Sequence, residues 1–304
     1  METNVLYNVP HAFALSELIS TYFFLLGVGG GCSLLSIWAT LTGKTDYRPL
    51  AKLGAVAVVA LFSFAPTLLI VDLGQPLRFW FLMVRGNASS PITWGSFFLT
   101  VYPMLASLYI IFLFMGKTKI YKPLAVALLP VAAGYVTYIG FIVSMAVSTS
   151  AWNTPVMPAY FASAAMVSAI ALMTMVGLVR YRILSPKWGP EVRDSQFGII
   201  IKLSRFASLF LLINLFFVFS QQVYMRFSSE WAAEAARLML SGGLGVNFGL
   251  FTVLLGTIVP LVAVATPRVN RNPGVLFVTM FLALVGIFVM RYAVTIGVQR
   301  LPIM

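Results

Sequence analysis

Long apolar segments recur along the whole sequence, and a segment of about 20 such residues suffices to cross a lipid bilayer as a helix. Eight segments reach that length: 13–41, 50–71, 94–115, 123–147, 159–180, 204–224, 244–265 and 274–297. Only 9% of the residues are charged, whereas a soluble domain carries roughly a quarter. Unbroken runs also differ from the short alternating strands of a membrane barrel. We therefore predict an all-α integral membrane protein with eight transmembrane helices.

The distribution of Lys and Arg predicts the orientation of these helices. The formal net charge is +12, but the basic residues lie in short loops and at helix ends, so no nucleic-acid partner is expected. Cytoplasmic loops carry an excess of Lys and Arg. Of the 20 basic residues, 14 lie in or beside loops that follow odd-numbered segments. The six on the opposite side are Arg78, Arg85, Arg226, Arg237, Arg291 and Arg300. Both termini are expected on the outer side, which is the periplasm in a Gram-negative cell.

A single cysteine and a single histidine limit the redox chemistry of the chain itself. Cys32 cannot form a disulfide within the chain, and one cysteine cannot ligate an iron–sulfur cluster. His11 alone cannot hold a haem between two histidines. We expect no haem, no iron–sulfur cluster and no metal site in this chain, so any electron must reside on a bound small molecule or on another subunit.

Two outer segments are longer than a turn requires. The segment Asp72–Thr93 places Trp80 near Arg78 and Arg85, which favours a docking surface for a partner over a plain connection. The segment Met225–Gly243 has the pattern of an amphipathic helix lying on the membrane surface. Within it, Glu234 and Arg237 stand at helical i,i+3 spacing.

Polar side chains inside apolar segments are candidates for function, because buried charge is costly in a bilayer. Glu17 is predicted about 6 Å below the outer end of the first helix, and Ser20 follows on the same face. Glu17 either exchanges protons from a buried position or lies at the interface and reaches water. Tyr22 and Tyr138 are predicted at similar depths. Tyr138 forms either a helix–helix hydrogen bond or a ligand contact.

Two further charges are less simply interpreted. Asp72 ends the second segment, where it either caps the helix and pairs with Arg78 or passes protons to outer water. Arg291 lies in the outer half of the last segment and needs an acid, a carbonyl or a ligand as its partner. Side-chain carbonyls for it could come from the sixth segment, in residues Asn214, Gln221 and Gln222, unless these form only a structural polar cluster.

Several motifs together resemble one family. They are FFLLGVGGG at Phe23–Gly31, DLGQPLRFW at Asp72–Trp80, SPITWGSFFL at Ser90–Leu99, YIGFIVS at Tyr138–Ser144 and VGIFVMRYAVTIGVQ at Val285–Gln299. In this order they resemble the NrfD/PsrC family, the quinone-reactive membrane subunits of polysulfide reductase and related complexes. Gln75 and Val298 stand where the family motifs usually have Arg and Gly.

The resemblance implies an architecture and a set of partners. It implies two four-helix bundles, here residues 1–149 and 150–304, in the inner (cytoplasmic) membrane with both termini outside. It implies menaquinone or another quinone bound in the first bundle near the outer face. It also implies a partner with four [4Fe-4S] clusters above that site and a molybdopterin or multihaem catalytic subunit beyond, besides the surrounding lipid.

The resemblance also implies roles for named residues. Tyr138 occupies the position of the family's quinone-binding tyrosine, whereas Tyr22 and Ile19 stand where its best-understood type has His and Asn. Ser20, Tyr22 and Tyr138 are then expected to bind the quinone. Glu17, Asp72 and Tyr138 are expected to handle its protons, and Arg78, Trp80 and Arg85 to dock the iron–sulfur partner. Two other classes stay open, a structural anchor without a quinone site and a secondary transporter.

Overall fold

The computed structural model describes residues 15–72, 76–78, 80–84, 86–87, 90–146, 149, 151–241 and 247–300, and these contain helices and no strand. Seven of the described helices are long and apolar enough to cross a membrane. They are α1 (Glu17–Leu41), α2 (Arg48–Asp72), α4 (Pro91–Phe114), α5 (Thr118–Ser144), α6 (Met157–Leu184), α7 (Pro190–Ser228) and α11 (Pro273–Tyr292). The prediction of an all-α integral membrane protein is confirmed.

The eighth predicted span corresponds to a shorter apolar helix, Gly249–Ala265. It consists of a π-helix, η4 (Gly249–Ile258), that runs directly into α9 (Val259–Ala265). Because the i→i+5 bonding of a π-helix places more residues in each turn, this segment is less extended than an α-helix of equal residue number. The count of eight crossing helices and the side on which the termini lie therefore stay predictions.

Short helices connect and extend the long ones. They are η1 (Thr45–Tyr47), η2 (Pro76–Arg78), α3 (Phe81–Val84), η3 (Ser185–Lys187), α8 (Glu230–Ser241), α10 (Pro267–Asn270), η5 (Ala293–Gly297) and η6 (Val298–Arg300). The amphipathic prediction for Met225–Gly243 is confirmed in α8, which buries Ala232, Ala235, Ala236 and Met239. On its exposed side, Glu234 and Arg237 approach to 3.6 Å. Its position on a membrane surface stays a prediction.

The start of α1 corrects the predicted depth of Glu17. Ser16 has extended backbone angles, and its side chain accepts a hydrogen bond from the Ile19 N–H at 3.3 Å. This N-cap begins the helix at Glu17, whereas the apolar run predicted a beginning near residue 13. Glu17 is consequently an exposed residue of the first helical turn, and its prediction as an acid well inside the span is wrong.

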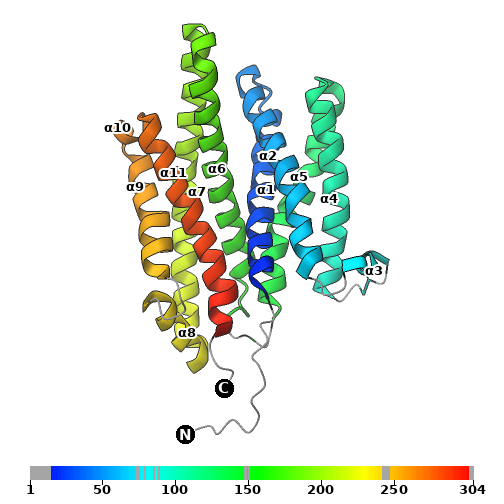
Figure 1. Ribbon diagram of the computed structural model, residues 1–304, viewed down its shortest axis with the longest axis vertical. Coiled ribbons are helices and arrows are strands. Elements are labelled where there is room, and N and C mark those ends of the chain that lie inside the picture. The colour runs from blue at the N-terminus through cyan, green and yellow to red at the C-terminus, as the bar shows by residue number, and fades with distance from the viewer. Residues whose placement is uncertain are drawn as a thin grey trace.

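Helix α1 lies between two groups of helices (Figure 1). On one side it packs against α2 and α5, and α5 in turn packs against α4. On the other side it packs against α6, which also contacts α7 and α11. The predicted boundary at residues 149 and 150 falls between α5 and α6. These two helices also contact each other, and the division into two four-helix bundles stays a prediction.

The glycine run of α1 lets its neighbours approach closely. A Cβ atom at Gly31 would lie 2.6 Å from the Ala165 carbonyl oxygen on α6. A Cβ atom at Gly30 would lie 2.5 Å from Val136 Cγ2 on α5. Small residues at such contacts favour close helix packing in membranes. The glycine motif therefore explains why α1 contacts both helix groups.

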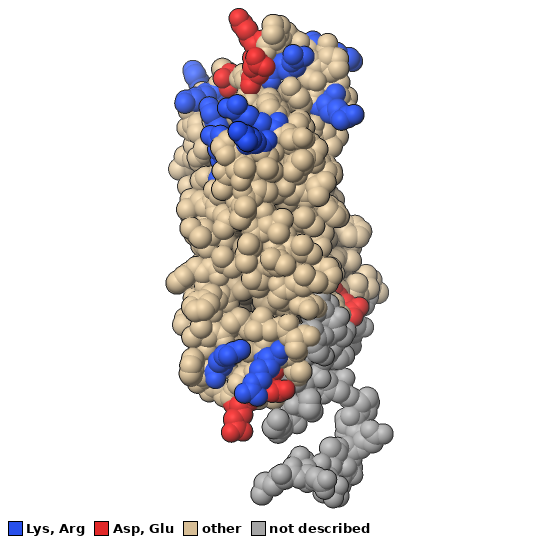
Figure 2. Space-filling view, turned by 90° about the vertical axis from the view of Figure 1, so that its left-hand side faces the viewer, with Lys and Arg blue, Asp and Glu red and all other residues tan. Residues whose placement is uncertain are grey.

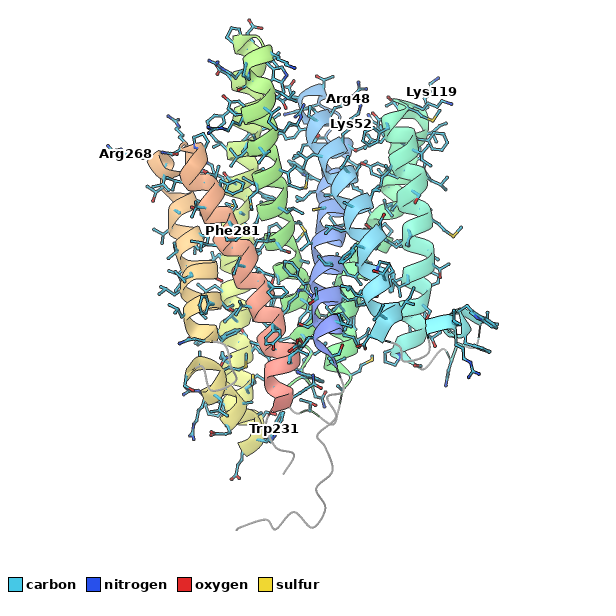
Figure 3. The ribbon with its side chains drawn as sticks, in the orientation of Figure 1. Arg48, Lys52, Lys119, Trp231, Arg268 and Phe281 are labelled. Atoms are coloured by element: carbon cyan, nitrogen blue, oxygen red, sulfur yellow. The ribbon has the colours of Figure 1, made fainter. Side chains whose placement is uncertain are left out.

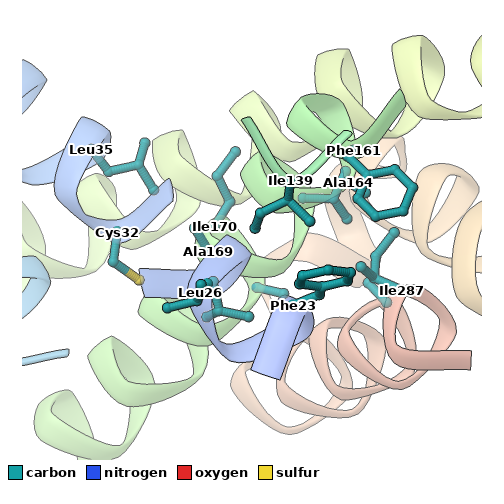
Figure 4. Close-up of a cluster of buried hydrophobic side chains, with 14 of the residues drawn as sticks. Phe23, Leu26, Cys32, Leu35, Ile139, Phe161, Ala164, Ala169, Ile170 and Ile287 are labelled. Atoms are coloured by element: carbon teal, nitrogen blue, oxygen red, sulfur yellow. The ribbon is translucent and has the colours of Figure 1, made fainter. Parts of the chain in front are cut away.

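The core between α1 and α6 is apolar (Figure 4). Phe23, Leu26 and Cys32 of α1 and Phe161 and Ile170 of α6 are each at most 4% exposed. The single cysteine is thus a packing residue of this core.

The two ends of the molecule differ in charge. On the face that Figure 2 shows, Lys and Arg gather at one end, and a broad belt without charged side chains follows. We call this the basic end; Arg48, Lys52, Lys119 and Arg268 lie there (Figure 3). At the other end, here called the Gln299 end, the Leu15 N–H donates to Gln299 Oε1 at 3.0 Å. This bond brings the first and last described segments together.

Candidate functional site

The hydroxyl of Tyr138 lies against the first turn of α4. It donates a hydrogen bond to the Pro91 carbonyl oxygen at 3.0 Å. A Cβ atom at Gly95 would clash with the same hydroxyl, so glycine is needed at this contact. Tyr138 is half-buried and joins α5 to α4, which is the helix–helix role that the sequence left open beside ligand binding.

Tyr138 belongs to a cluster of aromatic rings. We call it the aromatic cluster; its members are Phe62, Phe98, Tyr102, Tyr135 and Tyr138. The rings of Tyr102 and Tyr135 are stacked at 4.8 Å with an interplanar angle of 7°. Phe62 lies 5.4 Å from the Tyr135 ring, and Phe98 lies 5.5 Å from the Tyr138 ring. Residues of α2, α4 and α5 therefore meet here as flat, mainly apolar surfaces.

Two hydroxyls in this cluster are buried without a hydrogen-bond partner among the described residues, those of Tyr102 and Tyr135. The Tyr102 hydroxyl faces Ser33 without hydrogen-bond geometry. Leaving a buried donor unpaired costs about 1–3 kcal/mol, and such groups in native structures call for an explanation. Tyr102 was not among the candidates predicted from the sequence, although any tyrosine in the middle of an apolar segment needs a partner for its hydroxyl.

Tyr22 of α1 joins the same cluster. It is 5% exposed, and it lies close enough to Tyr135 and Tyr138 to interact with both electrostatically. The structure thus brings together two of the three residues that were expected to bind a quinone.

The third residue, Ser20, and the acid Glu17 lie on a different face of α1. The Tyr292 hydroxyl donates to Glu17 Oε1 at 3.1 Å, and Thr295 Oγ1 bonds to Ser20 Oγ at 2.9 Å. Positions three apart share a helix face, whereas Tyr22 is rotated well away from Glu17. Glu17 and Ser20 therefore contact α11 and η5 rather than the aromatic cluster.

Asp72 links the end of α2 to the start of α1. Its Oδ1 atom accepts a hydrogen bond from the hydroxyl of Ser16. This contact joins two helices, a role that the sequence did not indicate, and the pairing of Asp72 with Arg78 stays a prediction. Asp72 lies at the Gln299 end, where Ser16 is followed directly by Glu17.

The predicted docking segment projects beside the bundle at α3 (Figure 1). Arg78 is exposed at the end of η2. Trp80 is 47% exposed, and its ring stacks on Phe81 at 4.1 Å. Arg85 lies outside the described residues. Exposed aromatic and basic side chains of this kind are typical of binding surfaces.

Arg291 is a fully buried cation between α1, α6 and α11. Its Nη2 donates to the Phe161 carbonyl oxygen at 3.2 Å, and its guanidinium lies 4.7 Å from the centre of the Phe161 ring. Within the described residues, Nε and Nη1 have no hydrogen-bond partner. A Cβ atom at Gly27 would clash with this guanidinium. The carbonyl partner that the sequence required is therefore a backbone group of α6.

The predicted polar cluster of α7 has other partners. Asn214 Oδ1 accepts from the Ser163 hydroxyl at 3.2 Å, and Gln221 Nε2 donates to the Ala151 carbonyl oxygen at 2.7 Å. The Gln222 side-chain oxygen has no partner among the described residues. Asn214 and Gln221 thus hold α7 to α6 and to the segment before α6, which favours their structural interpretation.

The sequence is similar to one family of known proteins over almost its whole length. The family model described as Polysulphide reductase, NrfD matches residues 10–302. The protein is 25% identical over 296 residues to the C polypeptide of the polysulfide reductase of Wolinella succinogenes, covering 90% of both sequences. It is 24% identical to the Protein NrfD homolog of Haemophilus influenzae, covering 90% of this sequence and 91% of that protein. It is 23% identical to the Putative dimethyl sulfoxide reductase membrane subunit of Halobacterium salinarum, covering 97% and 72% respectively.

The match runs through the glycine face of α1, the aromatic cluster and the helix that carries Arg291. Because the family model covers almost the whole sequence, the resemblance of the separate motifs extends to the entire helical architecture. This chain belongs to the NrfD/polysulfide reductase family.

Proposed function

We propose that this protein is the quinone-reactive membrane subunit of a respiratory oxidoreductase complex. The observation that carries the proposal is the Tyr135 hydroxyl, which is buried without a partner among the described residues beside Tyr22 and Tyr138. Relatives named as a polypeptide of polysulfide reductase and as a membrane subunit of dimethyl sulfoxide reductase support the assignment to such a complex.

The aromatic cluster has the chemistry that a quinone requires. A quinone has a flat ring with two carbonyl acceptors, and when bound it supplies two-electron, two-proton redox chemistry. Tyr135 offers a hydroxyl that is free to donate, whereas the single hydroxyl proton of Tyr138 is already donated to Pro91. Tyr135 is then the principal donor. Tyr138 positions α4 against α5 and, like Tyr22, forms part of the wall.

Glu17 and Asp72 exchange protons with water in this proposal. Both lie at the Gln299 end, joined through the consecutive residues Ser16 and Glu17. Glu17 is exposed, and Asp72 is half-exposed. During quinol-driven turnover in sealed vesicles, the pH should therefore change only on the side that this end faces. Uptake of protons from the side of the basic end would contradict this routing.

The electrons pass to another subunit. With one cysteine and one histidine, this protein has no ligand set for a cluster or a two-histidine haem. We infer a partner with four [4Fe-4S] clusters docked at Arg78, Trp80 and Arg85, and a molybdopterin or multihaem catalytic subunit beyond it. The Gln299 end then faces outward from the inner membrane, with eight crossing helices in two bundles.

A photoreactive quinone analogue tests where the quinone binds. The complex is illuminated with the analogue, and the labelled peptides are mapped by mass spectrometry. We expect label on the first half of α4 and the second half of α5, and competition by unlabelled quinone. Complete absence of competed label would favour a structural anchor. Label confined to α7 and α11 would instead place the ligand among the helices that pack on the α6 side of α1, and would favour a transporter-like site.

A further inference from the structure

A cavity of about 800 Å³ opens between α2, α4 and α6, and no residue of the aromatic cluster lines it. Its walls are apolar along α2, where Leu53, Ala57 and Leu61 follow one another at helical spacing. Ligand pockets are typically about 300–1,000 Å³ in volume. The cavity is therefore large enough for a ligand, and its long apolar wall fits a hydrocarbon chain.

Three cations line this cavity at the basic end. Arg48 and Lys52 come from α2, and Arg180 comes from α6. The lining includes no acidic residue, and among the described residues none of the three cations forms an ion pair. Lys52 Nζ lies 5.3 Å from the centre of the Phe114 ring, and Arg48 lies near the hydroxyl of Tyr121. Positive charge from two helices thus converges on one apolar cavity.

A smaller cavity lies beside one of these cations, Arg48. It has a volume of about 70 Å³ and shares Arg48 and Tyr121 with the larger one, while adding Lys44 and Lys122. The positive-inside tendency explains why basic residues occur at this end. It does not require them to surround a cavity whose remaining wall is apolar.

We propose that this cavity binds an anionic phospholipid, with its phosphate at Arg48, Lys52 and Arg180 and an acyl chain along Leu53–Leu61. Basic pockets between transmembrane helices on the cytoplasmic side are suited to anionic head groups. The cavity lies between helices of both groups, since α2 and α4 precede the predicted boundary and α6 follows it. The lipid would therefore fill the gap between the two groups at this end.

The test uses the complete complex in nanodiscs that contain equal amounts of phosphatidylglycerol and phosphatidylcholine. Native mass spectrometry counts the lipids that remain bound. We expect retained phosphatidylglycerol in the unmodified complex, and about a fivefold loss of its preference for each of Arg48→Gln and Lys52→Gln. Lys119→Gln and Arg268→Gln are matched controls, because both remove an exposed cation from the same end outside the cavity (Figure 3).

A second pair of variants tests the acyl-chain groove without changing charge. Ala60→Trp fills the groove and should displace the lipid, whereas Val59→Trp, on the adjacent residue outside the cavity lining, should not. The proposal is overturned if the charge variants retain phosphatidylglycerol as the unmodified complex does. It is equally overturned if the control variants lose as much, or if the retained molecule is a quinone.

Discussion

At the residue scale, the buried Arg291 is the most unusual feature of the protein. A charge removed from water normally finds an acid, but here it has one backbone carbonyl and one aromatic ring. Burying a charge costs free energy unless hydrogen bonds replace the water that the group loses. The absence of a side chain at Gly27 creates the space that the guanidinium fills.

This contact predicts a measurable coupling between two positions. Gly27→Ala should destabilise the protein by about 1–3 kcal/mol, because the added methyl group overlaps a guanidinium that is completely buried among packed side chains. In an Arg291→Met background the same change should cost much less, since Met adapts its shape to available space. Thermal unfolding of the four variants in detergent measures the coupling, with Gly177→Ala, whose Cβ would lie 3.4 Å from Ile200, as the control. Equal costs in both backgrounds would show that Gly27 does not accommodate Arg291.

The sequence predicted that Arg291 needs a partner but not which one. The Phe161 carbonyl is a backbone group, and every residue type carries one, so no side-chain pattern points to it. The depth of Glu17 was predicted wrongly for a related reason. Hydropathy locates an apolar run, whereas the helix begins where Ser16 caps it. Likewise, the unpartnered state of Tyr135 depends on how three helices meet, which spacing along one helix cannot show.

At the element scale, hydropathy recovered the cores of the long helices better than their ends. The sixth apolar run, 204–224, lies inside α7, which has 39 residues. Charged residues near Glu191 are compatible with a helix but not with a membrane interior. The apolar run therefore marks only the part of the helix that is suited to lipid, and the helix itself is longer. In the segment between α2 and α4, hydropathy missed the helices altogether. Its helices η2 and α3 are too short to show a helical period of apolar residues.

That segment is where we expect the iron–sulfur partner to bind. Reversing both charges with Arg78→Glu and Arg85→Glu should release the partner when membranes are solubilised in detergent, because both residues flank Trp80 in the sequence. Arg237→Glu on α8 is the matched control, since it reverses an exposed Arg elsewhere at the Gln299 end. Co-purification of the two subunits is the measurement. If the partner is lost only with Arg237→Glu, the docking surface is α8 rather than the segment around α3.

At the scale of the whole molecule, the two ends have different chemistry. The Gln299 end holds Asp72 and Glu17. The aromatic cluster lies among α2, α4 and α5. The basic end holds the cations and the proposed lipid cavity. The order of helices, their apolar character and the family could all be predicted from the sequence. The contact of α1 with both helix groups required the structure, because it depends on glycines that face different partners.

The central claim, that Tyr135 donates to a quinone, is tested most directly by Tyr135→Phe. Deleting an unpaired buried hydroxyl should leave the thermal stability of the quinone-free protein unchanged or raise it. Quinol-linked turnover should nevertheless fall by about 5- to 150-fold, which corresponds to about 1–3 kcal/mol for the lost hydrogen bond. Tyr109→Phe is the control, because Tyr109 bonds to Ser36 and Thr40 and should lose stability while keeping turnover. Wild-type quinol kinetics in the Tyr135→Phe complex would contradict the account.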